Sequence, residues 1–333
     1  MTDWEYLQFA LERTTRHQSR LKFDRNMRAL KRAYRANGMG AAFDALTPEM
    51  RFNLCTARIY HRDFTNWAGW TFRDRWAIEW RLPHSIPMWH GENVDRLLVL
   101  GEQGIGDQIL WASVLPEAIV RCKHVTYTCD ARLISIFERS LPGLACREMD
   151  DDNELEGYDA YIGAADLMPL FRQRRSHFPR RAFLRALPRT YERFAGYRGC
   201  TGIGWAGRQG AIDPYALGLT RPVSLQHDAP HPCAASPALD LHHDLEGVLG
   251  LVANLSEVVA VPSSIVHIAG ALGVKASVIL PNLPGEIENQ IQWAFPPGEN
   301  AFYESVTTYE TIKDWRADTD NWIARDHRAT AQA

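Results

Sequence analysis

The sequence LLVLGEQGIGDQILWASVLPEA, from Leu97 to Ala118, joins an apolar run to a helix pattern through three glycines. An apolar run bounded by glycine is typical of a buried strand, which we expect from Arg96 to Gly101. The helix pattern that follows extends from Ile105 to Cys122. Glycines allow a tight turn and a close approach of the backbone, and a helix N-terminus presents N–H groups without intrahelical partners. The stretch therefore predicts a turn that approaches a ligand closely, with Asp107 beside it.

Strand and helix patterns alternate on both sides of a central arginine-rich stretch. The expected further strands are His124–Cys129, Leu144–Met149, Tyr158–Leu167 with its loop, Thr201–Gly207, Ala238–Leu241, Ser256–Pro262 and Ala276–Pro281, and the expected helices are Ala131–Ser140, Leu245–Asn254 and Ser263–Gly273. Such alternation predicts α/β units, each a parallel sheet covered by helices. Two such units in tandem leave a cleft at the carboxyl ends of their strands, where α/β proteins bind ligands.

The chain of 333 residues is long for one ordinary core and suits more than one domain. Residues 1–90 have apolar side chains at helical spacing, and the tryptophans between Thr65 and Pro83 indicate packing between helices. We expect this α-helical N-terminal segment to precede an N-terminal α/β domain at residues 91–190. A C-terminal α/β domain with a C-terminal helix then follows at residues 191–333.

Charge and cysteine content narrow the class of protein. The formal net charge is −3, so no overall field favours nucleic acid or an anionic membrane. The six cysteines form no CxxC pair, and we expect reduced thiols rather than a disulfide framework. The charged N-terminus lacks the apolar core of a secretory signal, and no run of about 20 residues is apolar enough to span a bilayer. These features predict a cytoplasmic protein without a transmembrane segment.

The order of the glycines argues against two familiar nucleotide sites. A dinucleotide site needs GxGxxG, whereas residues 101–106 read GxxGxG and are followed by an acid where phosphates would bind. A Walker loop needs GK[ST], which does not follow here. The helix dipole stabilises an anion at this position, so we expect Asp107 to be ionised. Two roles remain open for Asp107: a helix cap alone, or an acid–base group in the cleft.

A second helix begins at Pro262-Ser263-Ser264. Proline suits the first turn of a helix, and serine hydroxyls beside unbonded N–H groups make an anion site. His267 lies one turn into this helix, close to both serines. A single histidine in an apolar helix suits a core role as well as a functional one, and both remain open.

A third candidate site combines glycines with arginines. The strand pattern at residues 201–207 ends at Gly207, and Arg208 follows it directly. Arg221 comes after a loop that contains glycine and proline. A guanidinium is a permanent cation with bidentate donors, which suits phosphate. The alternative is that both arginines face solvent.

Taken in order, these motifs resemble a known enzyme family. The chain is similar to the GT-B glycosyltransferases of the heptosyltransferase type (glycosyltransferase family 9-like) in W-x-G-E, LLVLGEQGIGDQI with a downstream LP, GIGWAG, LTRPVSL, VxxSIVHIAGALG and VILP. The resemblance covers roughly Asp63 to Pro281, and the branch most like it has the transferase after tetratricopeptide-like helices. It implies two Rossmann-like domains that face a cleft, preceded by an α-helical segment.

The resemblance also implies roles for individual residues. In this family an aspartate in the glycine turn is the catalytic base, and Asp107 matches it. Gln103, Gly104 and Gly106 then form the acceptor-side turn. A nucleotide-sugar donor is implied in the C-terminal domain. Its phosphates would face the residues at the matching positions: Gly207, Arg208, Arg221, Ser263, Ser264 and His267.

The chain departs from the family pattern at two places. Pro262 and Ser263 stand where the family commonly has an acid and a threonine or serine, so the usual contact to the donor sugar is missing. The loop after Gly207 lacks the family's common lysine, so Arg208 or Arg221 would have to take its place.

The implied reaction needs neither metal nor cofactor, because no DxD-like motif stands in a suitable position. Asp107 would take a proton from the acceptor hydroxyl, while cations and a helix end stabilise the leaving diphosphate. The acceptor would be a glycan, a protein or another polymer. Nine arginines between Arg172 and Arg198 indicate either a solvated helix face that bridges the domains or a surface for an anionic acceptor.

Other functions fit parts of the sequence. A catalytically degenerate GT-B domain would act as a binding or scaffold module, and Pro262 favours this alternative. A nucleotide-sugar epimerase on the same architecture would need a second carboxylate and a histidine in the cleft, which the sequence does not place. An NAD dehydrogenase disagrees with the order of the glycines.

Overall fold

The computed structural model describes residues 85–102, 104–149, 156–207, 210–227, 231–280 and 298–319, together with a few single positions among the first 84. Most of the helical segment expected at residues 1–90 therefore lies outside the described residues. Gln103 and Arg208 lie outside them as well.

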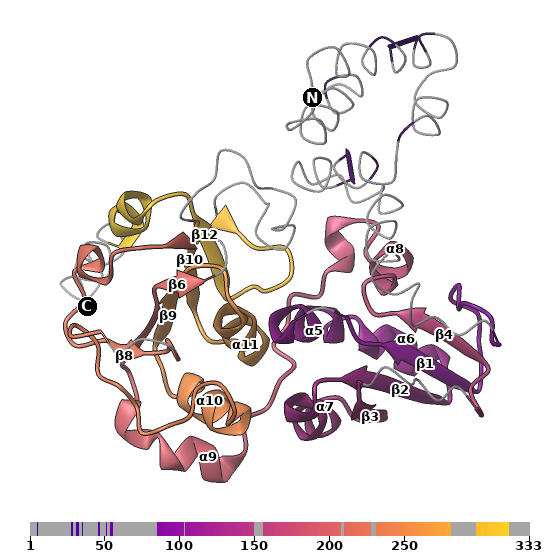
Figure 1. The fold of residues 1–333 in the computed structure, drawn as a ribbon, viewed down its shortest axis with the longest axis horizontal. Coiled ribbons are helices and arrows are strands. Elements are labelled where there is room, and N and C mark those ends of the chain that lie inside the picture. The colour runs from indigo at the N-terminus through magenta and orange to yellow at the C-terminus, as the bar shows by residue number, and fades with distance from the viewer. Residues whose placement is uncertain are drawn as a thin grey trace, which may run out of the picture.

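Within the described residues, four parallel strands form a first sheet, in the order β3-β2-β1-β4 (Figure 1). β1 (Arg96–Leu100) lies between β2 (His124–Cys129) and β4 (Ala160–Gly163), and β3 (Leu144–Glu148) forms an edge. The apolar run at residues 97–100 is buried, as in a parallel strand that is covered on both faces. The first sheet and its helices form the first half of the described chain, and the strands expected there are confirmed.

Helices connect the strands of the first sheet. α5 (Ile105–Ala112) follows β1, and α6 (Leu115–Arg121) leads to β2. The single helix expected from Ile105 to Cys122 is therefore wrong. The chain breaks at Ser113 because Pro116, in the first turn of α6, has no N–H and its ring would clash with the carbonyl four residues earlier. The further helices of this half are η1 (Ala131–Leu133), α7 (Ile134–Ser140), α8 (Leu167–Phe171) and η2 (Arg175–His177).

The described residues also form a second sheet of six strands, in the order β11-β12-β10-β9-β5-β8. All neighbouring strands pair parallel except β11 and β12. Their bounds are β5 (Thr201–Gly204), β8 (Val223–Ser224), β9 (Glu257–Ala260), β10 (Ala276–Ile279), β11 (Gly298–Glu299) and β12 (Val306–Tyr309). A separate antiparallel hairpin joins β6 (Ala206–Gly207) to β7 (Gly210–Ala211).

One expected strand of this half is wrong. Residues 238–241 form bends and a turn. Asp240 Oδ1 accepts hydrogen bonds from the backbone N–H groups of His242 and His243, at 3.0 and 2.9 Å. These side-chain bonds to the backbone take the place of a strand ladder. The edge of the sheet is β8 instead, which is too short to show an alternating pattern.

The helices of the second half begin at α9 (Pro188–Arg193), which packs against α10 (Leu245–Val252). A Cβ at Gly250 would lie 2.6 Å from the Thr190 backbone, so the two helices are in close contact. α9 spans residue 190, where the sequence predicts a domain boundary. The remaining helices are η3 (Ala195–Tyr197), η4 (Pro214–Leu217), α11 (Ser264–Leu272) and residues 312–319.

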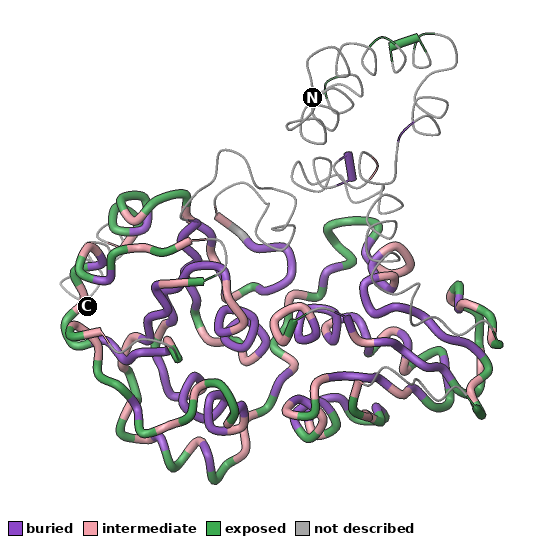
Figure 2. The backbone as a smooth tube through the Cα atoms, in the orientation of Figure 1, coloured by how far each residue is buried: buried purple, intermediate pink, exposed green. Residues whose placement is uncertain are grey.

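Buried apolar side chains of both sheets belong to one continuous cluster, and Figure 2 shows buried backbone running through both halves. α5 and α11 lie side by side between the sheets (Figure 1). Leu110 of α5 and Val266 of α11 are members of this cluster, and neither side chain is exposed. The two halves therefore share apolar packing at these helices.

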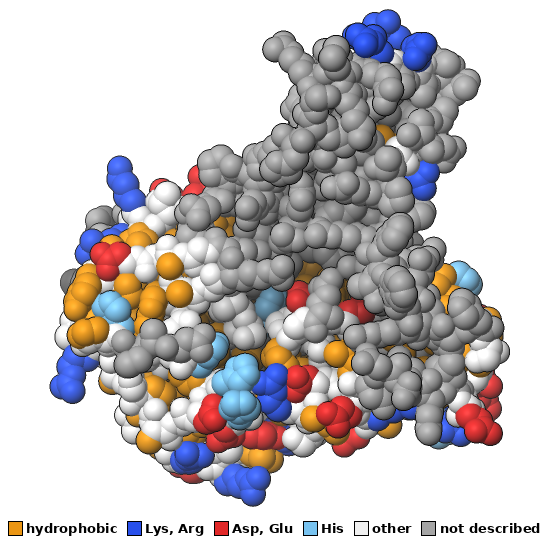
Figure 3. All heavy atoms as spheres, viewed as in Figure 1, with side chains coloured by type: hydrophobic (Ala, Val, Ile, Leu, Met, Phe, Trp, Pro, Cys, Tyr) orange, Lys and Arg blue, Asp and Glu red, His pale blue; other side chains and the backbone are white. Residues whose placement is uncertain are grey.

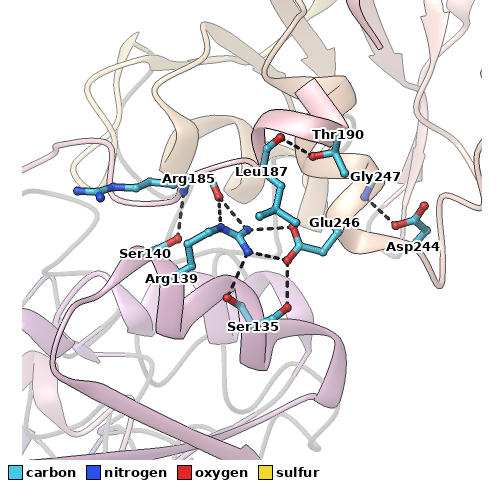
Figure 4. A network of polar contacts seen from close by, with 9 residues as sticks. All are labelled: Ser135, Arg139, Ser140, Arg185, Leu187, Thr190, Asp244, Glu246 and Gly247. Carbon is cyan, nitrogen blue, oxygen red and sulfur yellow. Dashed lines mark hydrogen bonds and ion pairs between the residues drawn. The ribbon is translucent and has the colours of Figure 1, made fainter. Parts of the chain in front are cut away.

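A polar contact also joins the halves (Figure 4). Arg139 on α7 donates to both carboxylate oxygens of Glu246 on α10, at 2.8 and 2.9 Å, and Ser135 Oγ donates to the same carboxylate at 3.0 Å. Arg139 also donates to the carbonyl oxygen of Arg185, in the segment that connects the halves, at 2.8 and 3.0 Å. A bidentate pair of this kind is geometrically specific, so it links α7 of the first half to α10 of the second.

The arginine-rich stretch from Arg172 to Arg198 divides into buried and exposed members. Arg172 is buried and donates to the Glu117 carboxylate, so it belongs to the core. Arg193 pairs with Asp244 of the second half at 3.4 Å. The exposed arginines are Arg174, Arg175, Arg181, Arg185, Arg189, Arg193 and Arg198. The stretch bridges the halves, and its binding of an anionic acceptor stays a prediction.

In the part of the chain that the structure describes, no helix has the length and apolar character needed to cross a bilayer. All six cysteines are free thiols, and Cys55, Cys122 and Cys129 are buried.

Candidate functional site

Two helix N-termini meet where the two sheets face each other. α5 begins after Gly104 and follows β1, and α11 begins after Ser263 and follows β9. A Cβ at Gly106 would lie 2.8 Å from His267 Cδ2 and 3.2 Å from Ser264 Cα. Any side chain at position 106 would push the helices apart, so glycine is required for this approach.

A cleft of about 380 Å³ opens between these two helix starts. Its first wall consists of Gly104, Ile105, Gly106, Asp107 and Arg132. The opposite wall includes His227, His242, Pro262, Ser263, Ser264 and His267. The cleft therefore lies at the carboxyl ends of interior strands of both sheets, where ligands bind in α/β proteins.

Asp107 lies in the first turn of α5, half-buried, and lines the cleft. Its Oδ2 accepts a hydrogen bond from the Gly104 N–H at 3.3 Å, so it caps the helix. The two roles that the sequence left open for Asp107 are thus compatible, because a capping carboxylate in the cleft can also accept a proton.

Ser263 is the N-cap residue of α11, with extended backbone dihedrals (φ −162°, ψ 168°). Its hydroxyl does not cap the helix. Among the described residues, its buried Oγ has no hydrogen-bond partner. A buried polar atom without a partner costs free energy, and a ligand atom in the cleft would relieve that cost.

His267 is 3% exposed, and its Nδ1 lies 3.1 Å from the hydroxyl of Tyr303. Burial lowers the pKa of His267 to about 3, so the ring is neutral at physiological pH. The ring belongs to the core and also lines the cleft, which joins the two roles that the sequence left open. A neutral imidazole adds no positive charge for a phosphate. It has one ring nitrogen that donates a hydrogen bond and one that accepts.

Arg132 brings a guanidinium into the cleft, which the sequence analysis missed. Its Nε and Nη2 each lie 2.8 Å from an oxygen of Asp130, and Nη1 donates to the His242 carbonyl oxygen of the opposite wall at 2.6 Å. Hydrogen bonds from Arg132 lower the pKa of the Asp130 carboxyl, and Asp130 in turn raises the pKa of Arg132. One signal in the sequence could have indicated this residue. Asp130, the partner of Arg132, directly follows the carboxyl end of β2, where α/β proteins bind ligands.

Two of the remaining predicted residues do not line the cleft. Gly207 packs against Pro262, since a Cβ there would lie 2.9 Å from the Pro262 carbonyl oxygen. Arg221 is exposed and has a positive φ of 52°. Neither residue lines the cleft, and Gln103 and Arg208 lie outside the described residues. The structure brings together Gly104, Gly106, Asp107, Ser263, Ser264 and His267.

A second cavity, of about 480 Å³, adjoins the cleft and shares His227, Leu241 and His242 with it. The rings of His227 and His242 lie 5.1 Å apart, and His243 Nδ1 lies 3.0 Å from Asp240 Oδ2. Figure 3 shows histidine side chains gathered beside arginine and acidic side chains near the boundary of the halves. Among the described residues, no three or more His, Cys, Asp or Glu side chains are grouped to hold a metal ion. Metal independence itself stays a prediction.

Comparison with known proteins finds no family model that matches the chain. Protein FlbA of Caulobacter vibrioides is 28% identical to it over 119 residues, which cover 30% of this chain and 20% of FlbA. The chain thus matches about a fifth of the length of that relative.

Three solved structures of glycosyltransferases are distantly similar. TibC from enterotoxigenic E. coli H10407, an iron-containing dodecameric glycosyltransferase, gives a TM-score of 0.42 at 13% identity, over 56% of this chain and 59% of TibC. A glycosyl transferase of family 9 from Veillonella parvula gives 0.46 at 11% identity, over 69% and 90% of the two chains. The ADP-heptose lipopolysaccharide heptosyltransferase II of E. coli gives 0.48 at 10% identity, over 70% and 99%. Likeness at this level concerns only the general course of the chain.

Proposed function

We propose that the chain is a glycosyltransferase with a GT-B arrangement, which moves a sugar from a nucleotide-sugar to an acceptor hydroxyl in the cleft. The observation that carries this proposal is the close approach of two helix starts at Gly106. One helix start carries the Asp107 carboxylate, and the other offers N–H groups and the buried Ser263 hydroxyl to an anion. Glycosyl transfer needs a proton acceptor and an anion-stabilising site within a few ångströms of each other.

The proposed base is Asp107. The acceptor oxygen forms a bond to the anomeric carbon while the bond from that carbon to the donor diphosphate breaks. The acceptor proton passes to the Asp107 carboxylate, and the electron pair leaves with the diphosphate. A carboxylate of ordinary basicity suffices because the acceptor hydroxyl becomes acidic only as its new bond forms.

The proposed anion site is the N-terminus of α11. The leaving diphosphate gains negative charge, which the helix end stabilises through its N–H groups and its dipole. Ser263 Oγ adds one donor, and Arg132 adds a guanidinium on the opposite wall. The adjoining cavity of about 480 Å³ offers room for the nucleoside.

The acceptor in this proposal is a glycan, a protein or another polymer. The exposed arginines of residues 172–198 would hold an anionic acceptor by charge, which salt weakens. Under the proposal, Asp107 acts without a metal or a cofactor.

A scaffold function is the second candidate, and Pro262 is the observation that favours it. In that case the cleft would have lost the donor contact that the acid supplies, and the domain would bind a partner without turnover. Donor binding and turnover separate the two candidates.

The deciding experiment incubates the full chain with a panel of nucleoside-diphosphate sugars, including ADP-heptose, the donor bound in one TibC structure. Thermal unfolding reports binding, and release of the nucleoside diphosphate reports turnover, each with and without EDTA. A bound donor at 100 times its dissociation constant adds about 2.7 kcal/mol to the free energy of unfolding. We expect one donor class to stabilise the protein and to be consumed in the presence of EDTA. Binding without turnover would favour the scaffold function. The absence of both binding and turnover would refute a donor site.

A further inference from the structure

Tyr303 reaches the cleft-lining His267 from a segment that no sequence motif singled out. Its hydroxyl oxygen lies 3.1 Å from His267 Nδ1, and the two rings meet edge to face at 5.8 Å between centroids. Tyr303 has no exposed surface. The contact therefore lies in the core, directly behind the wall of the cleft that His267 forms.

The surroundings of Tyr303 hold its ring in one place. A Cβ at Gly270 would lie 2.5 Å from the Tyr303 ring, so this glycine of α11 provides the space for it. The buried Asn300 side chain accepts hydrogen bonds from the backbone N–H groups of Phe302 and Tyr303, at 2.8 and 3.1 Å. Phe302 packs edge to face on Phe178 at 5.2 Å. The tyrosine hydroxyl is thus presented to His267 by a fixed segment.

The opposite edge of the His267 ring faces the start of α5. A Cβ at Gly106 would lie 2.8 Å from His267 Cδ2 and 3.5 Å from Nε2. Gly106 directly precedes Asp107. Burial raises the pKa of the Tyr303 hydroxyl well above its usual value, and the charge of Asp107 raises it further. The imidazole therefore lies between the tyrosine hydroxyl on its Nδ1 side and the acidic turn on its Nε2 side.

The partners of the Tyr303 hydroxyl determine which group donates the hydrogen bond between Tyr303 and His267. Among the described residues, His267 is the only hydrogen-bond partner of the Tyr303 hydroxyl. If His267 donated from Nδ1, the buried O–H proton of Tyr303 would have no acceptor, which is costly in the core. The hydroxyl must then donate its proton to Nδ1, and a neutral imidazole that accepts at Nδ1 carries its proton on Nε2.

We propose that Tyr303 is a positioning residue that fixes His267 in the Nε2–H tautomer and aims a neutral N–H donor at the cleft beside Asp107. This inference rests on the proposed function, which supplies the anionic substrate and the base that such a donor would serve. His267 stays neutral at working pH, so the donor is present throughout. A purely structural role for Tyr303 would instead leave the tautomer of His267 independent of the hydroxyl.

The test compares the unmodified protein with Tyr303→Phe, which removes the hydroxyl and keeps the ring. Nitrogen NMR of histidine-labelled protein distinguishes the two neutral tautomers, because protonated and unprotonated ring nitrogens resonate far apart. We expect Nε2 to be protonated in the unmodified protein. In Tyr303→Phe we expect the Nδ1 resonance to lose its hydrogen-bond shift and the second tautomer to become populated.

Tyr309→Phe is the matched control. Tyr309 lies six residues along the same segment, on β12, and its hydroxyl donates to Asp318 at 2.7 Å. Its loss should leave the His267 resonances unchanged. Transfer by Tyr303→Phe should fall by about 10²-fold through kcat with KM little changed, because loss of a tautomer-fixing partner costs up to ~10⁴-fold in other enzymes. Tyr309→Phe should stay within about twofold of the unmodified protein.

Two outcomes would overturn the inference. One is an Nδ1–H tautomer in the unmodified protein, which needs no variant and so does not depend on whether Tyr303→Phe folds. The other is a folded Tyr303→Phe protein whose His267 resonances match those of the unmodified protein. The NMR measurement uses no substrate, so absent transfer with the expected tautomer would refute the proposed function and leave the positioning by Tyr303 standing.

Discussion

The two helix starts that face each other across the cleft have the same architecture but differ in the charge of their side chains. In each, a buried parallel strand ends in a tight turn, and a helix N-terminus opens toward the cleft. The α5 start places the Asp107 carboxylate there, whereas the α11 start offers only uncharged groups: Ser263, Ser264 and the neutral His267. One strand-turn-helix unit can therefore supply a base or an anion site, depending on whether its first turn carries an acid.

Asp107→Asn removes the negative charge that distinguishes the α5 start from the α11 start. Asparagine keeps the size of the side chain and an oxygen for the Gly104 N–H, so the helix cap should survive. The proton acceptor is lost, so we expect kcat for transfer to fall by about 10³-fold, within the range of general-base catalysis. Thermal unfolding should change little, and donor binding should persist.

Asp95→Asn is the control for this change. Asp95 is exposed and pairs with Lys123 at 2.7 Å, away from the cleft. Its transfer rate should equal that of the unmodified protein. If Asp107→Asn also kept its full rate, Asp107 would be a cap alone and the contrast between the two helix starts would lose its chemical meaning.

The second change, Gly106→Ala, separates the helix starts from each other. The added methyl would lie 2.8 Å from His267 Cδ2 and 3.2 Å from the Ser264 backbone, so α5 and α11 must shift. Overpacking of this kind costs about 1–3 kcal/mol of unfolding free energy. A displacement near 1 Å between base and anion site should also lower the transfer rate by about 10²-fold.

Gly196→Ala is the matched control, because no described residue other than its chain neighbours has an atom within 4 Å of the position of its Cβ. Urea unfolding and transfer rates of both variants provide the measurement. Equal stability for Gly106→Ala and the unmodified protein would mean that the close approach of α5 and α11 at Gly106 does not contribute to the free energy of unfolding.

The third change, Ser263→Ala, tests the anion side alone. Its Oγ is buried without a hydrogen-bond partner among the described residues, so removing it should leave stability unchanged or raise it by up to about 1 kcal/mol. The affinity for a nucleoside diphosphate should fall about tenfold or more, because a hydrogen bond to a charged group contributes about 1.5–3 kcal/mol. Stability and affinity would then move in opposite directions.

Ser305→Ala is the control for that pair of measurements. Ser305 Oγ is also buried without a partner within the described chain, but Ser305 does not line the cleft. Its loss should affect stability in the same way and leave nucleotide affinity unchanged, as calorimetric titration would report. An unchanged affinity in Ser263→Ala would remove Ser263 from the anion site.

The elements that the sequence predicts correctly are those that a single local pattern determines. The run at residues 97–100 and the glycines after it predict β1, the turn and the start of α5, because burial and backbone freedom are local properties. The motif around His267 predicts α11 for the same reason. β8 was missed because two residues show no periodicity, and the strand expected at Ala238–Leu241 was wrong because Asp240 bonds to the backbone instead.

The site was only partly predictable, since some of its groups meet through tertiary contacts between distant segments. Arg132 is held in the cleft by the neighbouring Asp130 and by the His242 carbonyl oxygen of the opposite wall, and the second of these contacts joins residues 110 positions apart. Tyr303 reaches His267 from 36 residues away, through a space left by Gly270. Arg221 suited a phosphate site by residue type, yet it lies exposed and outside the cleft lining.

The smallest effect at neutral pH is expected for a change of His267, in the uncharged start of α11. Its contribution to the free energy of unfolding should become measurable as the pH falls. Burial lowers the pKa of His267 from 6.5 to about 3, so the unfolded chain binds a proton between these values and the folded chain does not. The full contribution to stability is therefore present above about pH 6.5 and is lost progressively as the pH falls toward 3. Per pH unit within this window, His267 removes up to about 1.4 kcal/mol from the free energy of unfolding.

His267→Gln lacks the titrating ring, so its stability should fall less steeply with acid. Between about pH 6 and pH 4.5 the unmodified protein should lose about 2 kcal/mol more than the variant, as urea unfolding across that range would measure. His90→Gln is the control for replacing a histidine by glutamine at an exposed position. Parallel curves for His267→Gln and the unmodified protein would mean that burial does not lower the pKa of His267 and that the folded and unfolded chains take up this proton alike. The α11 start would then carry positive charge below about pH 6.5, and its contrast with the Asp107 turn would depend on pH.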